Sequence, residues 1–168
     1  LVESPEAWIW IILGSALGGL LGAFTAQRVA MTAMPETVAL FNGCGGMSSL
    51  LVAIAVRLFP VNNSSVGLVA TISIVISVFV GSITFTGSMV AMAKLKGWLS
   101  TPAWMQSKIR HVINIALSSI SLVAIVALLG GGDTELWLLL GSSALLGIGV
   151  TLPIGGADMP VVISLLNS

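Results

Sequence analysis

The side chains that could do chemistry in this chain are amides and hydroxyls set in apolar stretches. Three asparagines stand out, namely Asn42, Asn114 and Asn167. An amide or a hydroxyl donates and accepts hydrogen bonds at the same time, so a series of them can order water or pass a proton. The same groups also join helices to one another inside membranes. Relay of a small charged species and helix–helix adhesion are therefore the two interpretations of these residues.

The last fourteen residues, 155–168, concentrate this polar character (GGADMPVVISLLNS). They begin as a Gly-rich loop that carries an acid, Asp158. Pro160 suits the first turn of a helix, where its missing N–H costs nothing. The polar side chains of that helix share one face, because their spacing is i, i+3 and i+4; they are Ser164, Asn167 and Ser168. An acidic loop that opens into a helix with one polar stripe suggests a path for a small charged species.

The elements that must position these residues are transmembrane helices. Apolar residues make up 57% of the 168 residues and charged residues only 7%, whereas a soluble domain carries about 25% charge. The mean hydropathy is +1.12. Long apolar runs without strand alternation predict an all-α, polytopic transmembrane helix bundle. The formal net charge of zero gives no indication of a nucleic-acid partner.

Five full spans and the start of a sixth are predicted. They cover residues 8–26, 37–59, 66–93, 111–129 and 136–152, and the sixth helix begins at residue 160. Five of the six Lys and Arg residues then fall on one side of the membrane, with Lys94 in the basic loop after the third span, and Arg57 alone falls on the other. The positive-inside rule makes the basic side the inner one, so Asp158 faces inward.

The third span carries a continuous stripe of small and polar residues at steps of four, four, three and four. Its members are Ser73, Ser77, Gly81, Thr84 and Ser88. Thr84 and Ser88 fall in the inner half of the membrane, as Asn42 and Asn167 do. A hydrated pocket entered from the inner side is one interpretation. Packing, with each hydroxyl bonded to its own backbone, is the other.

The chain offers no catalytic constellation of its own. No Asp, Glu, Lys or His is expected inside the membrane, and His111 is placed at the edge of the basic loop. Metal-ligand spacing, a catalytic triad and a phosphate-binding loop are all missing from the sequence. We therefore expect no catalytic, cofactor-binding or metal-binding residue here, and a titrating group for proton transfer would come from elsewhere.

Three blocks of the sequence resemble a known family. They are RVAMTAMPETVALFNGCGG at 28–46, ITFTGSMVAMAKLKG at 83–97, and the 155–168 stretch quoted above. In this order and spacing they are similar to the proton-translocating NAD(P) transhydrogenase, in the membrane domain of the subunit that also carries the NADP(H)-binding domain. The resemblance covers essentially the whole chain.

The resemblance implies that residues 1–168 are the transmembrane proton-channel domain of a longer subunit, with the NADP(H)-binding domain further along the same chain. The complete enzyme would transfer hydride between NAD(H) and NADP(H), neither of which this domain would bind. Expected partners are an NAD-binding subunit with its own membrane helices, a second protomer and the lipid bilayer. The expected location is the bacterial inner membrane or the mitochondrial inner membrane.

Three residues take roles from the same resemblance. Asp158 matches an acid at the face that meets the NADP(H)-binding domain, and Asn167 matches an Asn of the channel helix. Asn42 stands where some members carry a channel His and others an Asn, so the titrating His would come from the partner subunit. Two other classes of function stay open: a secondary transporter, although internal repeats are not evident, and a non-conducting scaffold subunit.

Overall fold

The computed structural model describes residues 5–59, 67–130 and 134–167 of the chain, without the side chains of Pro5, Trp104, Gln106 and Asn167. The long helices are α1 (Pro5–Arg28), α2 (Met34–Leu58), α3 (Leu68–Leu95), α4 (Ile109–Leu129) and α5 (Thr134–Thr151). The short elements are η1 (Met31–Ala33), η3 (Ala103–Gln106), η4 (Gly156–Asp158) and α6 (Met159–Asn167). Five of the described helices are long and apolar enough to cross a membrane. The prediction of an all-α, multi-pass membrane protein is confirmed.

The predicted helix ends are correct to within a few residues, and one difference matters. The third span was expected to end at residue 93, with Lys94 in the loop beyond it. Instead, the last residue of α3 is Leu95. Gly97, two residues beyond it, has a φ of 71° in the left-handed region and turns the chain away from the helix. The Trp98 N–H donates to the Ala93 carbonyl at 2.9 Å, which closes the helix end. Lys94 therefore lies in the last turn of α3.

The chain divides into two compact units, 1–34 and 35–168. The first unit contains α1, whose apolar side chains are exposed along its length, Trp10 and Leu20 among them. A helix with such a surface suits a lipid environment or contact with other transmembrane helices.

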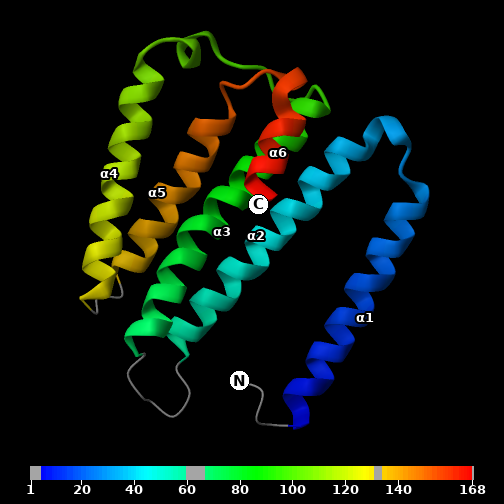
Figure 1. Ribbon diagram of the computed structural model, residues 1–168, viewed down its shortest axis with the longest axis vertical. Helices are drawn as coiled ribbons and strands as arrows, with labels where there is room; N and C mark the ends of the chain where they lie inside the picture. The colour runs from blue at the N-terminus through cyan, green and yellow to red at the C-terminus, as the bar shows by residue number, and fades with distance from the viewer. Residues whose placement is uncertain (1–4, 60–66, 131–133, 168) are drawn as a thin grey trace. The chain divides into compact units, whose positions relative to one another are not determined.

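The second unit is built around α3 (Figure 1). At one end, side chains of α2, α3, α4 and α5 form a common apolar core, to which Leu50, Val78, Leu128 and Leu139 belong. Toward the other end, α6 packs on α2 and α3 through Met159 and Ile163. Thus α3 contacts both the α4–α5 pair and the α2–α6 side.

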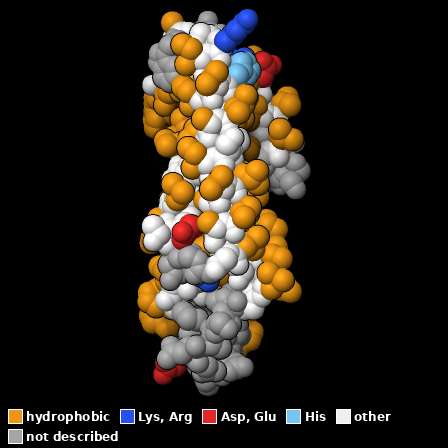
Figure 2. All heavy atoms as spheres, turned by 90° about the vertical axis from the view of Figure 1, so that its left-hand side faces the viewer, with side chains coloured by type: hydrophobic (Ala, Val, Ile, Leu, Met, Phe, Trp, Pro, Cys, Tyr) orange, Lys and Arg blue, Asp and Glu red, His pale blue; other side chains and the backbone are white. Residues whose placement is uncertain are grey.

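The outer surface of α4 is what a bilayer requires. Apolar side chains cover the length of its visible face, and basic side chains and the single His gather at its upper end (Figure 2). Val112, Leu122 and Val126 are each more than 60% exposed. Apolar flanks with charged groups confined to the end are typical of a lipid-facing helix.

Candidate functional site

The polar stripe of α3 faces α2. Its middle is a close contact between two glycines: a Cβ added to Gly46 would lie 2.9 Å from the Gly81 carbonyl oxygen, and one added to Gly81 would lie 2.8 Å from the Gly46 carbonyl oxygen. Thr84, which is buried, lies at the same contact. Glycines at such a contact let two helix backbones approach closely in a membrane, because no Cβ lies between them. The contact fixes how α2 and α3 align above and below it.

On the side of the glycine contact that is predicted from the basic loop to face inward, the stripe meets the first predicted asparagine. The Asn42 Nδ2 donates to the Ser88 Oγ at 2.9 Å, and Ser88 is fully buried. Asn42 is eight residues from the start of α2 and Ser88 is seven from the end of α3. At about 1.5 Å per residue, both lie about 10–12 Å from these helix ends, which is less than half of a membrane core about 30 Å thick.

On the outer side of the same contact, the stripe opens into a groove of about 480 Å³. Hydroxyls from both helices line it, together with apolar side chains; they belong to Ser48, Ser49, Ser73 and Ser77. The Ser48 hydroxyl donates to the Gly45 carbonyl at 2.9 Å, and the Ser73 hydroxyl donates to the Val69 carbonyl at 3.0 Å. The α2–α3 interface thus carries polar groups on both sides of the glycine contact.

The α6 helix brings the third predicted asparagine to the level of Ser88. A Cβ added to Gly87 would lie 3.2 Å from the Leu166 Cδ1, and Leu166 precedes Asn167, the last residue of α6. Ser164 is exposed on the same helix. The Asn167 side chain and the whole of Ser168 lie outside the described residues. Their predicted roles stay predictions.

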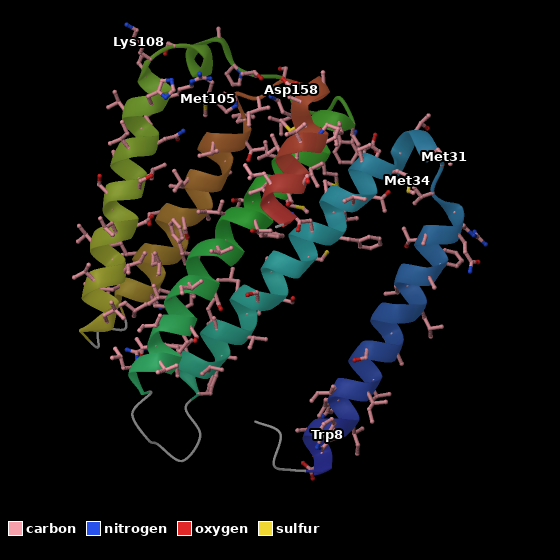
Figure 3. All side chains as sticks on the ribbon, viewed as in Figure 1. Trp8, Met31, Met34, Met105, Lys108 and Asp158 are labelled. Carbon is pink, nitrogen blue, oxygen red and sulfur yellow. The ribbon has the colours of Figure 1, made fainter. Side chains whose placement is uncertain are left out.

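Asp158 ends the short η4 helix and is exposed. Its N–H donates to the Gly155 carbonyl at 3.1 Å, while the next residue, Met159, is fully buried. Asp158, Met105 and Lys108 lie toward the same end of the second unit (Figure 3). The acid is thus presented on a tight turn next to a buried anchor.

The structure gives Asn114 different surroundings from Asn42. Its Nδ2 donates to the Gly149 carbonyl at 3.1 Å, between α4 and α5. In a continuing helix that carbonyl would accept from residue 153, but Pro153 has no N–H. Asn114 supplies the missing donor. Its hydrogen bond therefore caps the end of α5 and does not connect Asn114 to Asn42 or Ser88.

Lys94 is a site residue that the sequence analysis missed. Its Nζ donates to the Thr101 hydroxyl at 2.6 Å, to the Leu152 carbonyl at 2.5 Å and to the Ile154 carbonyl at 2.6 Å. The Thr101 hydroxyl donates to the Leu152 carbonyl at 3.1 Å. A lysine near a span's end normally extends to the interface. Here the ammonium instead caps α5 and the loop that leads to Asp158.

The only histidine, His111, stands exposed at the start of α4, where its Nε2 accepts a hydrogen bond from the Arg110 Nε at 3.3 Å. Among the side chains that the structure describes, no three His, Cys, Asp or Glu residues lie close enough to hold a metal ion. Among the described side chains, the groups that meet at Asn42 are an amide and a hydroxyl, which can donate and accept hydrogen bonds at the same time.

Known proteins with similar sequences indicate the family of this chain. Residues 2–168 match the family model described as NAD(P) transhydrogenase beta subunit. Two curated relatives, both named NAD(P) transhydrogenase subunit beta and both from Rhodospirillum rubrum, are each 37% identical over 174 residues. The alignment covers 100% of this chain and 37% of each relative.

The chain therefore spans little more than a third of the length of these relatives. The match extends over the six helices described above, including the Asn42–Ser88 contact and the Asp158 loop. The chain belongs to the NAD(P) transhydrogenase beta subunit family.

Proposed function

We propose that this chain is the membrane proton-translocating part of an NAD(P) transhydrogenase, which couples proton movement to hydride transfer between NAD(H) and NADP(H). The observation that carries the proposal is the hydrogen bond from Asn42 to Ser88 in the inner half of the membrane. An Asn amide has four hydrogen-bonding positions and a Ser hydroxyl has three, so one bond between them leaves capacity for water or for another side chain.

The proposed path runs along the α2–α3 interface and the adjoining face of α6. Its inner part consists of Asn42, Thr84 and Ser88 together with three α6 residues; these are Ser164, Asn167 and Ser168. A titrating His of the partner subunit would carry the proton at Asn42. Asn114 is left out of this path because its amide donates to the Gly149 carbonyl between α4 and α5, away from the α2–α3 interface.

Coupling to the nucleotide is proposed to pass through Asp158. The NADP(H)-binding domain would follow in the same chain and dock on this acid at the inner face. The NAD(H)-binding subunit would complete the protomer, and two protomers would form a dimer. A bacterial or mitochondrial inner membrane suits this arrangement. One proton crossing about 100 mV supplies about 2.3 kcal/mol, which corresponds to about a fifty-fold change in nucleotide affinity.

The test is a pair of substitutions in the complete enzyme, reconstituted in sealed vesicles. Asn42→Leu and Asn167→Leu should abolish proton movement coupled to hydride transfer, because leucine cannot hold water or pass a hydrogen bond. Assembly, followed by membrane yield and size-exclusion chromatography, should be retained. Unchanged pumping in Asn42→Leu would reject the path and favour a scaffold.

The docking role of Asp158 has its own test. Asp158→Asn removes the charge but keeps the shape of the side chain, so it should alter NADP(H) affinity while the membrane domain still assembles. Normal nucleotide affinity and normal turnover in this variant would count against the docking face. A secondary transporter would instead bind its solute without any response to NADP(H).

A further inference from the structure

We propose that Lys94 is a positioning residue that fastens the Asp158 loop to the same stretch of α3 that holds Ser88. The inference rests on the proposed function and adds the physical link between the proton path and the face that meets the nucleotide domain. It begins from the Lys94 ammonium, whose three N–H groups each find an oxygen: one hydroxyl and two main-chain carbonyls.

The bonds that Lys94 makes are of the strong kind. A lysine ammonium has three donors, so all of them are used, and hydrogen bonds from a charged donor are about twice as strong as neutral ones. The acceptor Leu152 directly follows the last residue of α5, and a cation at a helix C-terminus is stabilised by the helix dipole. Ile154 lies further on, toward Asp158. The ammonium therefore holds the start of the loop, not only the end of the helix.

The other end of the loop is attached to α3 as well. Met159, directly after Asp158, is fully buried in a cluster that contains Ala91 of α3 and Ala39 of α2. Between the two attachments, the Asp158 N–H closes a turn on the Gly155 carbonyl. Asp158 thus rides on a short segment whose two ends are both held by α3.

The attachments on α3 follow one another along less than two turns. Ser88 accepts from Asn42, Ala91 packs with Met159, and Lys94 binds the Ile154 carbonyl. Successive attachments are three positions apart in the sequence, so the set spans about 9 Å at about 1.5 Å per residue. Packed helices shift as rigid elements. A displacement of α3 when the Asn42–Ser88 bond is made or broken would therefore move both ends of the Asp158 loop.

The test uses the complete enzyme in sealed vesicles and measures NADP(H) affinity with and without an imposed proton gradient. In the unmodified enzyme the gradient should change the affinity. The gradient effect is the factor by which the gradient changes NADP(H) affinity. In Lys94→Met, which keeps an apolar stem and loses the ammonium, this factor should fall by about tenfold, because a hydrogen-bonded charge is lost from the link. Hydride transfer in detergent, where no gradient exists, reports whether the nucleotide sites are intact.

Lys96→Met is the matched control. Lys96 lies two residues further along, is exposed, and places its Nζ 4.6 Å from the centre of the Trp98 ring rather than on the loop. The Lys96→Met variant removes one positive charge at the same end of α3, as Lys94→Met does, and should leave the gradient effect unchanged. Lys94→Arg retains a charged donor and should restore part of the effect, which a merely space-filling role would not predict.

Thr101→Val keeps the inference testable if Lys94→Met fails to assemble. It removes one acceptor of the ammonium and the hydroxyl bond to Leu152 without changing the charge. A loss of about twofold to fivefold in the gradient effect is expected, smaller than for Lys94→Met because the ammonium keeps its two carbonyl acceptors. A gradient effect equal to that of Lys96→Met in an assembled Lys94→Met or Thr101→Val enzyme would overturn the link. Should Asn42→Leu abolish pumping in the same preparations, only this link would fall and the proposed path would stand.

Discussion

The α2–α3 and α4–α5 interfaces use the same kinds of polar residue in opposite ways. Between α4 and α5, the Ser121 and Ser142 hydroxyls lie 2.8 Å apart and both side chains are buried. Each hydroxyl also lies within hydrogen-bond distance of a carbonyl of its own helix: Leu117 for Ser121 and Leu139 for Ser142. Between α2 and α3, an amide meets a hydroxyl on one side of the Gly46–Gly81 contact, and an open groove lined by serines lies on the other side.

The difference teaches which polar contacts in a membrane protein stabilise and which leave room for chemistry. The Asn114 amide donates to a carbonyl that Pro153 leaves without a main-chain donor, so removing it exposes an unsatisfied group. The Asn42 amide donates to a hydroxyl that can bond elsewhere. The same amide group thus has different consequences at the two positions, set by whether its acceptor has an alternative.

The largest effect is expected at the glycine contact that shapes the α2–α3 interface. Gly46→Ala places a Cβ 2.9 Å from the Gly81 carbonyl oxygen and 2.9 Å from the Phe85 nitrogen. These are backbone atoms, so the helices must separate, at a cost of about 3 kcal/mol. Thermal unfolding in detergent measures the loss.

The neighbouring glycine provides the control for this change. A Cβ added to Gly45 meets no heavy atom within 4 Å, and alanine favours a helix by up to about 1 kcal/mol over glycine. Gly45→Ala should therefore leave the unfolding temperature unchanged or raise it slightly. Equal losses in the two variants would mean that close approach at Gly46 does not organise the interface.

This contact also marks how far the sequence could go. The apolar runs and the spacing of Ser73, Gly81 and Ser88 predicted a helix with one small, polar face, because helical periodicity and the cost of polar groups in lipid are local properties. The structure confirms that face: Gly81 meets Gly46 and Ser88 meets Asn42. The partner helix could not be predicted, because spacing within one span says nothing about which span it contacts.

The Lys94 contacts were beyond the sequence for a different reason. Hydropathy ended the third span at residue 93, and a lysine next to other basic residues indicates a solvated loop. One signal was present: a helix that ends near Pro153 leaves its last carbonyls without main-chain donors, so side chains had to supply some of them. Which side chain could reach that end depends on tertiary packing.

The second effect in size is expected for the asparagine of the α4–α5 interface. Asn114→Leu leaves the Gly149 carbonyl without its side-chain donor and should lower the free energy of unfolding by about 1–2 kcal/mol. Coupled proton movement should remain close to normal, in contrast to Asn42→Leu. Unfolding in detergent and pumping in vesicles, measured on the same preparations, separate the two. Loss of pumping without loss of stability would bring Asn114 back into the proton path.

The smallest effect is expected for the serine pair of the same interface. Ser121→Ala removes a 2.8 Å bond to Ser142, and hydrogen bonds between membrane helices contribute about 0.6 kcal/mol on average. Ser142 keeps the Leu139 carbonyl as an acceptor, so the loss should stay below about 1 kcal/mol, and the double variant with Ser142→Ala should lose little more. Ser119→Ala is the control, because the Ser119 hydroxyl is exposed and donates only within α4, to the Ile115 carbonyl at 2.9 Å. A coupling energy near zero in this double-mutant cycle would leave Asn114 as the main polar attachment between α4 and α5. A coupling energy well above 1 kcal/mol would mean that the α4–α5 interface depends on its hydroxyls as strongly as the α2–α3 interface depends on Asn42.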